Sequence, residues 1–527
     1  MSRPVVLIAE ELSPATMAAL GEGFQIDHVD GADRAALLAA VPAAEALLIR
    51  SATKVDAEVL DAAPRLRVVA RAGVGLDNVD VKAATARGVM VVNAPTSNIT
   101  SAAELAVGLL LAVLRRIVPA NLSLRAGQWQ RSRFTGVELA GKTVGIIGLG
   151  RIGVLVAQRL AGFGVTLIAY DPYIQPTRAA AHGVRMVTLE ELLRTADVLT
   201  VHLPKTPETV GLLNAEALAL VKPTAVLINA ARGGIVDEAA LYEALTTGRL
   251  AGAGLDVFTV EPCPDSPLFA LDTVVATPHL GASTDEAQEK AGIAVAHSVR
   301  LALAGELVPD AVNVDGGVIA VDVRAYLPVT EHLGQIACAL APAAITHVEV
   351  GVAGEIAEHE VGVLALSALK GIFTGLVHDP VSYVNAPLLA AERGVTSELK
   401  VSREPADHRS VVRVRLDTTA GASVAVAATA PAPHGVARLV AVDEFDVDVP
   451  ISAHLAFFRY HDRPGVVGMI GNILGRAAIN IAGMQVARTA AGGEALVVLT
   501  VDEGIDAPTV AEITAAIGAR FGRAVDL

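Results

Sequence analysis

Three residues of different chemical type could together move a proton and hold an anion: Arg232, Glu261 and His279. Each follows an apolar run that predicts a short buried strand. The three runs are 225–229, 253–258 and 273–277. Because the carboxyl ends of parallel strands meet at one edge of a sheet, we expect the three side chains to lie close together.

Their chemistry is complementary. Histidine ordinarily titrates near neutrality, so His279 can take the proton of an alcohol while a hydride leaves for an acceptor. Glu261 would orient the imidazole and stabilise its protonated form, and Arg232 offers a planar fork for a carboxylate. Taken singly, the histidine could be structural and Glu261-Pro262 an ordinary turn.

A glycine-rich stretch upstream favours catalysis. Gly148-Leu149-Gly150-Arg151-Ile152-Gly153 lies between an apolar strand pattern and an Ala/Leu/Val helix pattern. The spacing predicts a tight turn at Gly148, an approach of a pyrophosphate to Gly150 and close helix–strand packing at Gly153. Asp171 ends the next strand pattern, 23 residues after Gly148, where a carboxylate accepts from ribose hydroxyls and repels a 2′-phosphate. The stretch therefore predicts a dinucleotide site that prefers NAD to NADP.

Cations follow two of the apolar runs near the start of the chain. Arg50 and Lys54 come after the run 46–49, and Arg71 follows 68–70. Such positions suit an anionic substrate, although loop charges are often merely solvated. The loop around Trp129, which carries Arg131, could equally be a subunit contact or part of the site.

A polar turn precedes the long helix expected through Leu114. Ser101-x-x-Glu104 is a capping-box signature, which predicts that this helix begins near Ser101. Residues of about 318–450 hold β-rich and helical stretches without a catalytic constellation. From 453 to 527 the pattern is β-α-β-β-α-β, a ferredoxin-like arrangement.

Composition limits the class of protein. A chain of 527 residues predicts three or four domains. Although 53% of residues are hydrophobic, the longest apolar run, 105–114, is far short of the roughly 20 residues that a spanning helix needs. The net charge of −15 argues against nucleic-acid binding. Two cysteines, Cys263 and Cys338, predict neither a disulfide framework nor a metal site, and fit the reducing cytoplasm.

Over roughly its first 315 residues the chain resembles the D-2-hydroxyacid dehydrogenases. The motifs that carry the resemblance are the loop at Gly148, Asp171, Asn-Ala-Ala-Arg-Gly-Gly from Asn229, Gly-Leu-Asp-Val-Phe from Gly254 to Glu261-Pro262, and Thr-Pro-His-Leu-Gly from Thr277. It implies an α/β fold in which a Rossmann cofactor domain, residues 99–286, is inserted in a flavodoxin-like substrate domain, residues 1–98 and 287–316. It also implies that Arg232, Glu261 and His279 carry catalysis.

The resemblance assigns two further sets of residues. The residues expected to bind NAD are Gly148, Gly150, Arg151, Ile152, Gly153, Asp171, Leu203, Ala230, Arg232, Asp256 and His279. The residues expected to meet the substrate are Arg50, Lys54, Arg71, Asn98 and Arg131. The run of ten residues from Arg71 is typical of the branch that oxidises 3-phosphoglycerate, and Glu261 argues against the formate-oxidising branch, which has Gln there.

The rest of the chain resembles the long form of that branch. Residues 317–450 are similar to its α+β intervening domain, and residues 451–527 to ACT domains, whose signature is Asp462-Arg463-Pro464-Gly465. Tyr460, Asp462 and Asn480 match positions that hold L-serine, although the domain could serve only subunit contacts.

The resemblance implies an NAD-dependent oxidation of 3-phospho-D-glycerate to 3-phosphohydroxypyruvate, the entry to serine synthesis. It further implies inhibition by L-serine and a homo-oligomer, a tetramer. Two alternatives stay open: a dehydrogenase for another D-2-hydroxyacid such as 2-hydroxyglutarate, and a nucleotide-sensing binding protein on the same fold.

Overall fold

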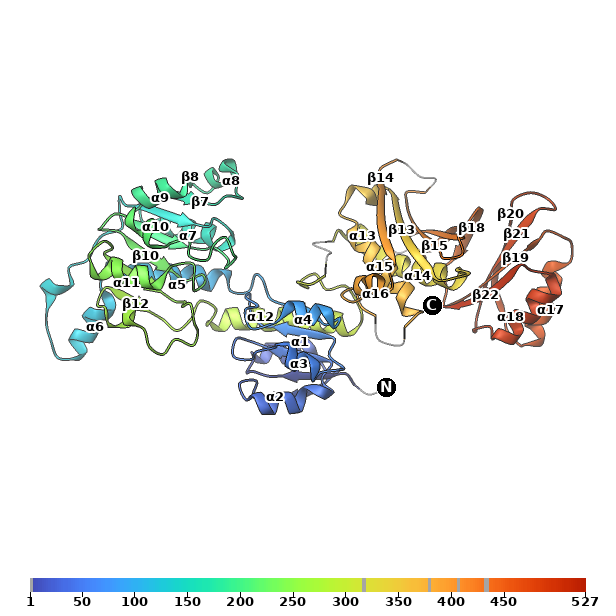
Figure 1. The fold of residues 1–527 in the computed structure, drawn as a ribbon, viewed down its shortest axis with the longest axis horizontal. Helices are drawn as coiled ribbons and strands as arrows, with labels where there is room; N and C mark the ends of the chain where they lie inside the picture. Colours follow the sequence, from blue (N-terminus) through green and yellow to red (C-terminus); the bar gives the residue numbers. More distant parts are fainter. Residues whose placement is uncertain (1–2, 315–318, 378–380, 405–407, 431–435) are drawn as a thin grey trace.

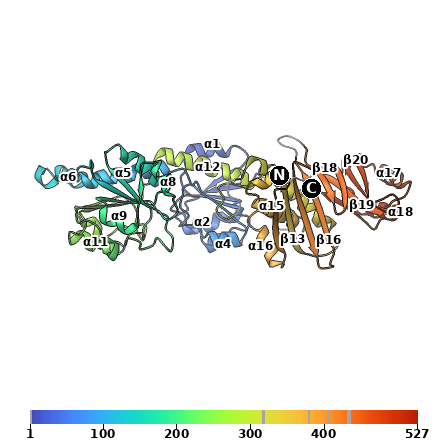
Figure 2. The same ribbon diagram turned by 90° about the horizontal axis from the view of Figure 1, so that it is seen from above.

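The computed structural model describes residues 3–314, 319–377, 381–404, 408–430 and 436–527. Four β-sheets lie in a row along the long axis of the molecule (Figures 1 and 2). The cofactor sheet expected around the glycine loop stands at one end, and the C-terminal sheet stands at the other. The predicted domain boundary at 316/317 lies outside the described residues.

The first sheet has five parallel strands in the order β2-β1-β3-β4-β5, as in flavodoxin-like folds. Its strands are β1 (Val5–Ile8), β2 (Gln25–His28), β3 (Ala46–Ile49), β4 (Val68–Arg71) and β5 (Met90–Val92). Its helices are α1 (Pro14–Leu20), α2 (Arg34–Ala40), α3 (Ala57–Asp61), α4 (Val81–Ala86) and the 3₁₀ turn η1 (Val41–Ala43). The long helix α12 (Asp285–Leu303) returns from the second sheet and packs against α1.

The second sheet has seven parallel strands in the order β12-β11-β10-β9-β6-β7-β8, the doubly wound Rossmann order. Its strands are β6 (Thr143–Ile147), β7 (Thr166–Tyr170), β8 (Arg185–Met186), β9 (Val198–Val201), β10 (Val226–Asn229), β11 (Gly252–Leu255) and β12 (Val274–Ala276). Its helices and turns are α5 (Ile99–Leu114), α6 (Ile117–Arg125), η2 (Arg131–Phe134), α7 (Arg151–Ala161), α8 (Pro176–Ala180), α9 (Leu189–Thr195), α10 (Ala215–Ala219), α11 (Glu238–Thr246) and η3 (Pro267–Ala270).

The third sheet is mostly antiparallel, with the order β14-β13-β15-β16-β17-β18. Its strands are β13 (Ile345–Gly354), β14 (Thr396–Ser402), β15 (Ser410–Thr418), β16 (Ser423–Thr429), β17 (Arg438–Val442) and β18 (Phe445–Pro450). Its helices are α13 (Val321–Arg324), α14 (Tyr326–Leu340), η4 (Glu355–Glu358), α15 (Gly362–Thr374) and α16 (Ala386–Glu392).

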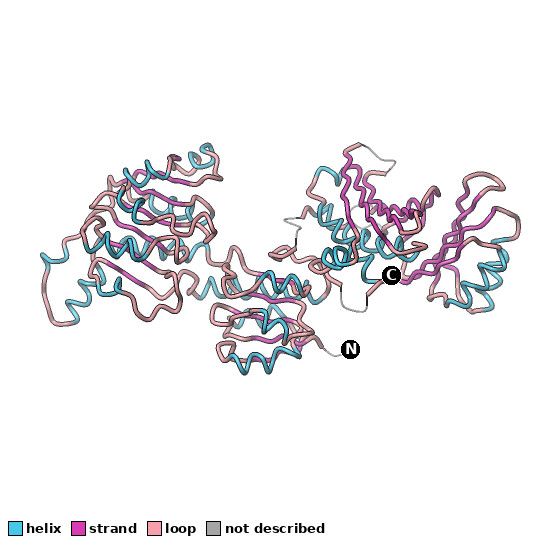
Figure 3. The backbone as a smooth tube through the Cα atoms, in the orientation of Figure 1, coloured by secondary structure: helices cyan, strands magenta, loops and turns pink. Residues whose placement is uncertain are grey.

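The fourth sheet has the ferredoxin-like order β20-β21-β19-β22. Its elements are β19 (His454–His461), α17 (Val466–Arg476), β20 (Ile481–Arg488), β21 (Glu494–Val501), α18 (Ala507–Ile517) and β22 (Phe521–Asp526). Figure 3 shows α17 and α18 on one side of these strands. Along β19, Phe458 and Tyr460 face these helices, whereas Leu455 and Phe457 join the core of the third sheet, so the last two sheets share one apolar core.

The predicted fold class is confirmed, and three local expectations were wrong or missing. The sequence did not predict β2, because its edge position leaves its residues only partly buried, or the two-residue β8. The long helix begins at Ile99 with Asn98 as its N-cap, not at a Ser101 capping box. Ser101 instead donates to the carbonyl of Asn98, and Glu104 pairs with Arg159. Among the described helices none is by itself long and apolar enough to cross a membrane; α5 and α6 pass such a test only as a pair bent by 64°.

Candidate active site

The glycine loop has the geometry that a dinucleotide site needs. Gly148 has φ +96°, and a Cβ there would lie 2.7 Å from the carbonyl oxygen of His202. At Gly153 a Cβ would lie 2.2 Å from the carbonyl oxygen of Gly148, so only glycine lets α7 approach the strand. A Cβ at Gly150 would meet nothing within 4 Å. The loop is therefore closed where the protein packs and open where a pyrophosphate would approach the start of α7.

Asp171 lies at the tip of β7 against this loop. Its carboxylate accepts from the backbone N–H of Leu149 and of Tyr173, each at 2.9 Å. These two bonds fix the side chain beside the glycine turn. This is the position in which a carboxylate is expected to meet the ribose of a dinucleotide.

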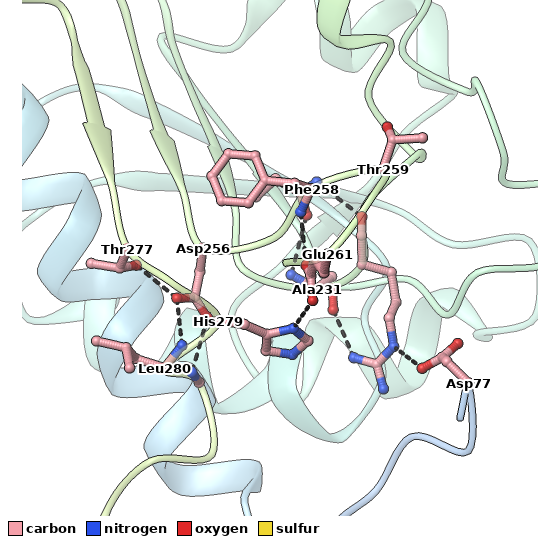
Figure 4. A network of polar contacts seen from close by, with 12 residues as sticks. Asp77, Ala231, Asp256, Phe258, Thr259, Glu261, Thr277, His279 and Leu280 are labelled. Atoms are coloured by element: carbon pink, nitrogen blue, oxygen red, sulfur yellow. Dashed lines mark hydrogen bonds and ion pairs between the residues drawn. The ribbon is translucent and has the colours of Figure 1, made fainter. Parts of the chain in front are cut away.

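His279 and Glu261 form the pair that the sequence predicted (Figure 4). Nδ1 of His279 lies 2.6 Å from Oε2 of Glu261, and Oε1 of Glu261 accepts from the Phe258 N–H at 2.8 Å. Partial burial acts to raise the pKa of Glu261, but the hydrogen bonds from His279 and Phe258 outweigh it and hold the pKa below its ordinary value. An ionised Glu261 assigns the proton to Nδ1 of His279, which leaves Nε2 as the acceptor.

Asp256 holds the histidine loop in place. Its buried carboxylate accepts from the Thr277 hydroxyl and the Leu280 N–H, both at 2.7 Å, and from the Gly281 N–H at 2.9 Å (Figure 4). Burial raises its pKa, although these bonds oppose the rise. The loop is strained, because His279 has φ +54°. The structure gives Asp256 this positioning role, and its contact with the cofactor stays a prediction.

Arg232 reaches the site from the end of β10. Its Nη1 donates to the Ala231 carbonyl at 2.7 Å, and its Nε lies 3.5 Å from Oδ2 of Asp77, which lies in the loop after β4 of the first sheet. Asn229 braces the turn, because its amide donates to the Arg232 carbonyl and accepts from the Ala231 N–H. The sequence analysis assigned no role to Asn229 or Asp77, although each lies within a family motif. No pattern in the sequence indicates which residues they contact.

Arg71 carries the strongest sign of an anion site in the first sheet. Its Nε is buried and has no hydrogen-bond partner among the described residues. Burial lowers its pKa, and repulsion from Arg232 and Arg50 adds to the effect, while Asp77 and Glu10 oppose it. Arg232 and Arg50 are thus close enough to Arg71 to disfavour its charge, which an anionic ligand would relieve.

The other predicted substrate residues differ in placement. Oδ1 of Asn98 is also buried without a partner in the described part of the chain. Lys54, by contrast, is 76% exposed and pairs with Asp56 at 3.7 Å. Arg131 is exposed on η2, which follows α6 in the chain. The charges that act most strongly on Arg71 are those of Arg232, Asp77, Glu10 and Arg50, and Arg131 is not among them.

The remaining predicted cofactor residues surround the glycine loop. Leu203 packs on it, because a Cβ at Gly148 would lie 2.8 Å from its side chain. Arg151 and Ile152 open α7, and Ala230 directly follows β10. All three therefore come directly after a strand or loop at the carboxyl edge of the second sheet.

The three predicted serine residues do not meet within one chain. Tyr460 and Asp462 lie at the end of β19, where Asp462 accepts from Arg488 and from the Gly492 N–H, each at 3.2 Å. Asn480 precedes β20 and donates to Asp502 at 2.7 Å, at the opposite end of the same sheet.

Comparisons with known proteins agree with this architecture. The family profile of the D-isomer specific 2-hydroxyacid dehydrogenase NAD binding domain matches residues 107–281. The D-3-phosphoglycerate dehydrogenase intervening domain matches residues 322–443, and the ACT domain matches residues 454–518.

Similar proteins match over the whole chain or over part of it. D-3-phosphoglycerate dehydrogenase of Mycobacterium tuberculosis is 55% identical over 527 residues, covering 100% of both chains. The protein of that name from Synechocystis is 39% identical, covering 99% of this chain and 94% of its own. Among solved structures, the TT0316 protein from Thermus thermophilus is 37% identical with a TM-score of 0.54, covering 58% of this chain and 99% of its own. An NADPH-dependent glyoxylate/hydroxypyruvate reductase from Sinorhizobium meliloti, in complex with NADP and malonate, is 34% identical with a TM-score of 0.53, covering 59% of this chain and 97% of its own.

The solved relatives share the fold of the part of the chain that they cover. The two parallel sheets, the histidine–carboxylate pair and the glycine loop of this chain fit a dehydrogenase. An enzyme is thereby favoured over a nucleotide-sensing binding protein. The chain is an NAD-dependent dehydrogenase and belongs to the D-3-phosphoglycerate dehydrogenase family, in the long form with an intervening domain and an ACT domain.

Proposed function

We propose that the chain oxidises the C2 hydroxyl of 3-phospho-D-glycerate with NAD, giving 3-phosphohydroxypyruvate, the first step of L-serine synthesis. The observation that carries the choice of substrate is Arg71, whose buried Nε lacks a partner among the described residues and whose charge is repelled by Arg232 and Arg50. A substrate with both a carboxylate and a phosphate would supply the missing negative charge. The names of the full-length relatives support the same substrate.

The proposed reaction uses the site as a proton acceptor and an anion clamp. Bound NAD supplies the hydride acceptor. Nε2 of His279 takes the hydroxyl proton as the C2–H bond breaks and the C2–O bond becomes a carbonyl. Glu261 stabilises the imidazolium that forms, and Arg232 holds the carboxylate beside the reacting carbon.

The proposal includes the predicted domains and contacts. Residues 1–98 and 287–316 would bind substrate, 99–286 NAD, 317–450 would form the intervening domain and 451–527 the ACT domain. Gly150 and the start of α7 would face the pyrophosphate, Gly148 and Gly153 would shape the loop, and Asp171 would meet the ribose. The enzyme would act in the cytoplasm.

L-Serine is proposed as a feedback inhibitor that binds between two copies of the chain. Within one sheet Asp462 and Asn480 stand at opposite ends, so one copy would contribute Tyr460 and Asp462 and the other Asn480. Oligomerisation also fits α6 and the loop after it, which expose a set of large apolar side chains. They are Ile117, Leu122, Leu124 and Trp129. A homotetramer is the state proposed from the family.

The proposed function predicts NAD reduction with 3-phosphoglycerate that millimolar L-serine suppresses. Initial rates of NADH formation, measured by absorbance with and without serine, test both the catalytic site and the regulatory role of the ACT domain. Turnover that serine leaves unchanged would remove serine as the effector. Turnover of 2-hydroxyglutarate but not of 3-phosphoglycerate would show that the proposed substrate is wrong and favour 2-hydroxyglutarate.

Asn480→Ala should weaken inhibition by serine. Loss of an amide contact to a charged ligand costs about 1.5–3 kcal/mol, so the inhibitory concentration should rise about 10- to 150-fold. Serine titrations of the initial rate measure this, with each variant's uninhibited rate as its reference. Glu512→Gln is the control, since Glu512 pairs with Arg476 on the helical face. An unchanged inhibitory concentration for Asn480→Ala would exclude Asn480 from the serine site.

A further inference from the structure

Asp77 connects the two halves of the active site. It lies in the loop after β4 of the first sheet, and its Oδ2 is 3.5 Å from Nε of Arg232, which follows β10 of the second sheet (Figure 4). The Asp77 side chain is 68% exposed, whereas that of Arg232 is 28% exposed. The carboxylate therefore approaches the guanidinium from the solvent side.

The loop that carries Asp77 is shaped around this contact. A Cβ at Gly75 would lie 2.6 Å from Nη2 of Arg232 and 2.8 Å from Oδ2 of Asp77. The backbone at Gly75 thus passes directly against the ion pair. Asn78, the next residue after Asp77, anchors the loop by donating to the carbonyls of Arg50 and Thr53 at 2.8 and 2.6 Å.

The charges around Arg232 indicate that Asp77 acts there as a counter-ion. Arg232 and Arg50 repel the charge of Arg71, and Asp77 and Glu10 are the carboxylates that offset this repulsion. Glu10 is already engaged by three backbone N–H groups, those of Arg50, Ala52 and Thr53. Asp77 is the member of the set that can move away, because its side chain is mostly in solvent.

We propose that Asp77 is a positioning residue: it is the counter-ion of Arg232 while the site is empty, and it gives way when the carboxylate of the 2-hydroxyacid binds the guanidinium. Nη1 of Arg232 is held by the Ala231 carbonyl, so a planar carboxylate that uses the Nε side of the fork must take the place of Asp77. The inference rests on the proposed function, because it assumes an anionic substrate at Arg232. Asp77 would thereby orient Arg232 before the substrate binds, but it would also compete with the substrate carboxylate for the guanidinium.

Binding of malonate to the NAD-loaded enzyme, measured by isothermal titration calorimetry, tests the proposal without turnover. Competition from an exposed ion pair is worth a factor of about 1.5 to 5, so the Kd of malonate should fall by that factor in Asp77→Asn. Asp77→Glu keeps the charge and should restore the wild-type Kd. The control is Asp27→Asn, which removes a charge from β2 of the first sheet, where Asp27 accepts from Gln25. This variant should leave the Kd unchanged.

Steady-state kinetics provide a second test of the proposal. In Asp77→Asn the KM for 3-phosphoglycerate should fall with the Kd of malonate, while kcat falls because Arg232 is less well oriented. The fall in KM should shrink in 1 M salt, where the Debye length is about 3 Å. A Kd of malonate that rises or stays the same in Asp77→Asn would overturn the proposal. Absence of wild-type turnover with 3-phosphoglycerate would instead contradict the proposed substrate and leave the malonate result to decide on Asp77.

Discussion

Replacing His279 by alanine should lower kcat by about 10²- to 10⁴-fold, because the variant has no group in place to accept the hydroxyl proton. The imidazole is held by Glu261 at 2.6 Å, and its loop is held by the buried carboxylate of Asp256. Steady-state rates of NAD reduction with 3-phosphoglycerate measure the effect. The Kd of NAD should change little, since the glycine loop and Asp171 are untouched.

The chain offers a matched control for this variant. His454 and Asp526 form a second histidine–carboxylate pair, with Nδ1 2.7 Å from Oδ1, in the last sheet. His454→Ala removes the same kind of contact from β19, which carries none of the catalytic residues. It should leave kcat within about two-fold, and the loss of such a surface pair costs only about 0–1 kcal/mol of stability. If kcat of His279→Ala stayed within ten-fold of the wild type, His279 would be rejected as the base.

The parallel sheets could be predicted because buried parallel strands are continuous apolar runs. The apolar runs 46–49, 68–70 and 225–229 marked β3, β4 and β10 in this way. The strand β2 was not marked, because its edge position leaves Gln25 and His28 exposed. Placing Arg232, Glu261 and His279 together required only that strand ends meet at one edge. The glycine roles were predictable because they depend on backbone geometry within a single turn.

Contacts between distant segments could not be predicted where no strand end or chemical complementarity marked both partners. Nothing near Asp256 in the chain indicates that Thr277, Leu280 and Gly281 donate to it, and nothing near Asp77 indicates Arg232. The capping box failed because Asn98 begins the helix one turn earlier, which buries Ser101. Strand pairing likewise decides that Asp462 and Asn480 stand at opposite ends of a sheet.

Arg71→Ala should raise the KM for 3-phosphoglycerate by about 10- to 150-fold, the equivalent of a charged hydrogen bond worth about 1.5–3 kcal/mol. The sequence assigned Arg71 and Lys54 alike to the anion, and burial now separates them. Nε of Arg71 is buried and unpartnered among the described residues, whereas Lys54 is 76% exposed and already paired with Asp56. Lys54→Ala is therefore the matched control, and its KM should change less than about five-fold. Steady-state kinetics with varied 3-phosphoglycerate, together with the Kd of NAD, separate the two effects.

The stability of Arg71→Ala distinguishes a binding role from a structural one. Burial and repulsion lower the pKa of Arg71 in the folded state, so its protonated form is disfavoured relative to the unfolded chain. Because arginine stays protonated at neutral pH, this is a constant cost that the variant no longer has. Its melting temperature should therefore equal or exceed that of the wild type, apart from the lost packing of the side-chain stem. If Arg71 serves to bind the substrate, the variant should show a large rise in KM without a loss of stability. A parallel loss of NAD affinity and stability would mean that Arg71 supports the fold instead.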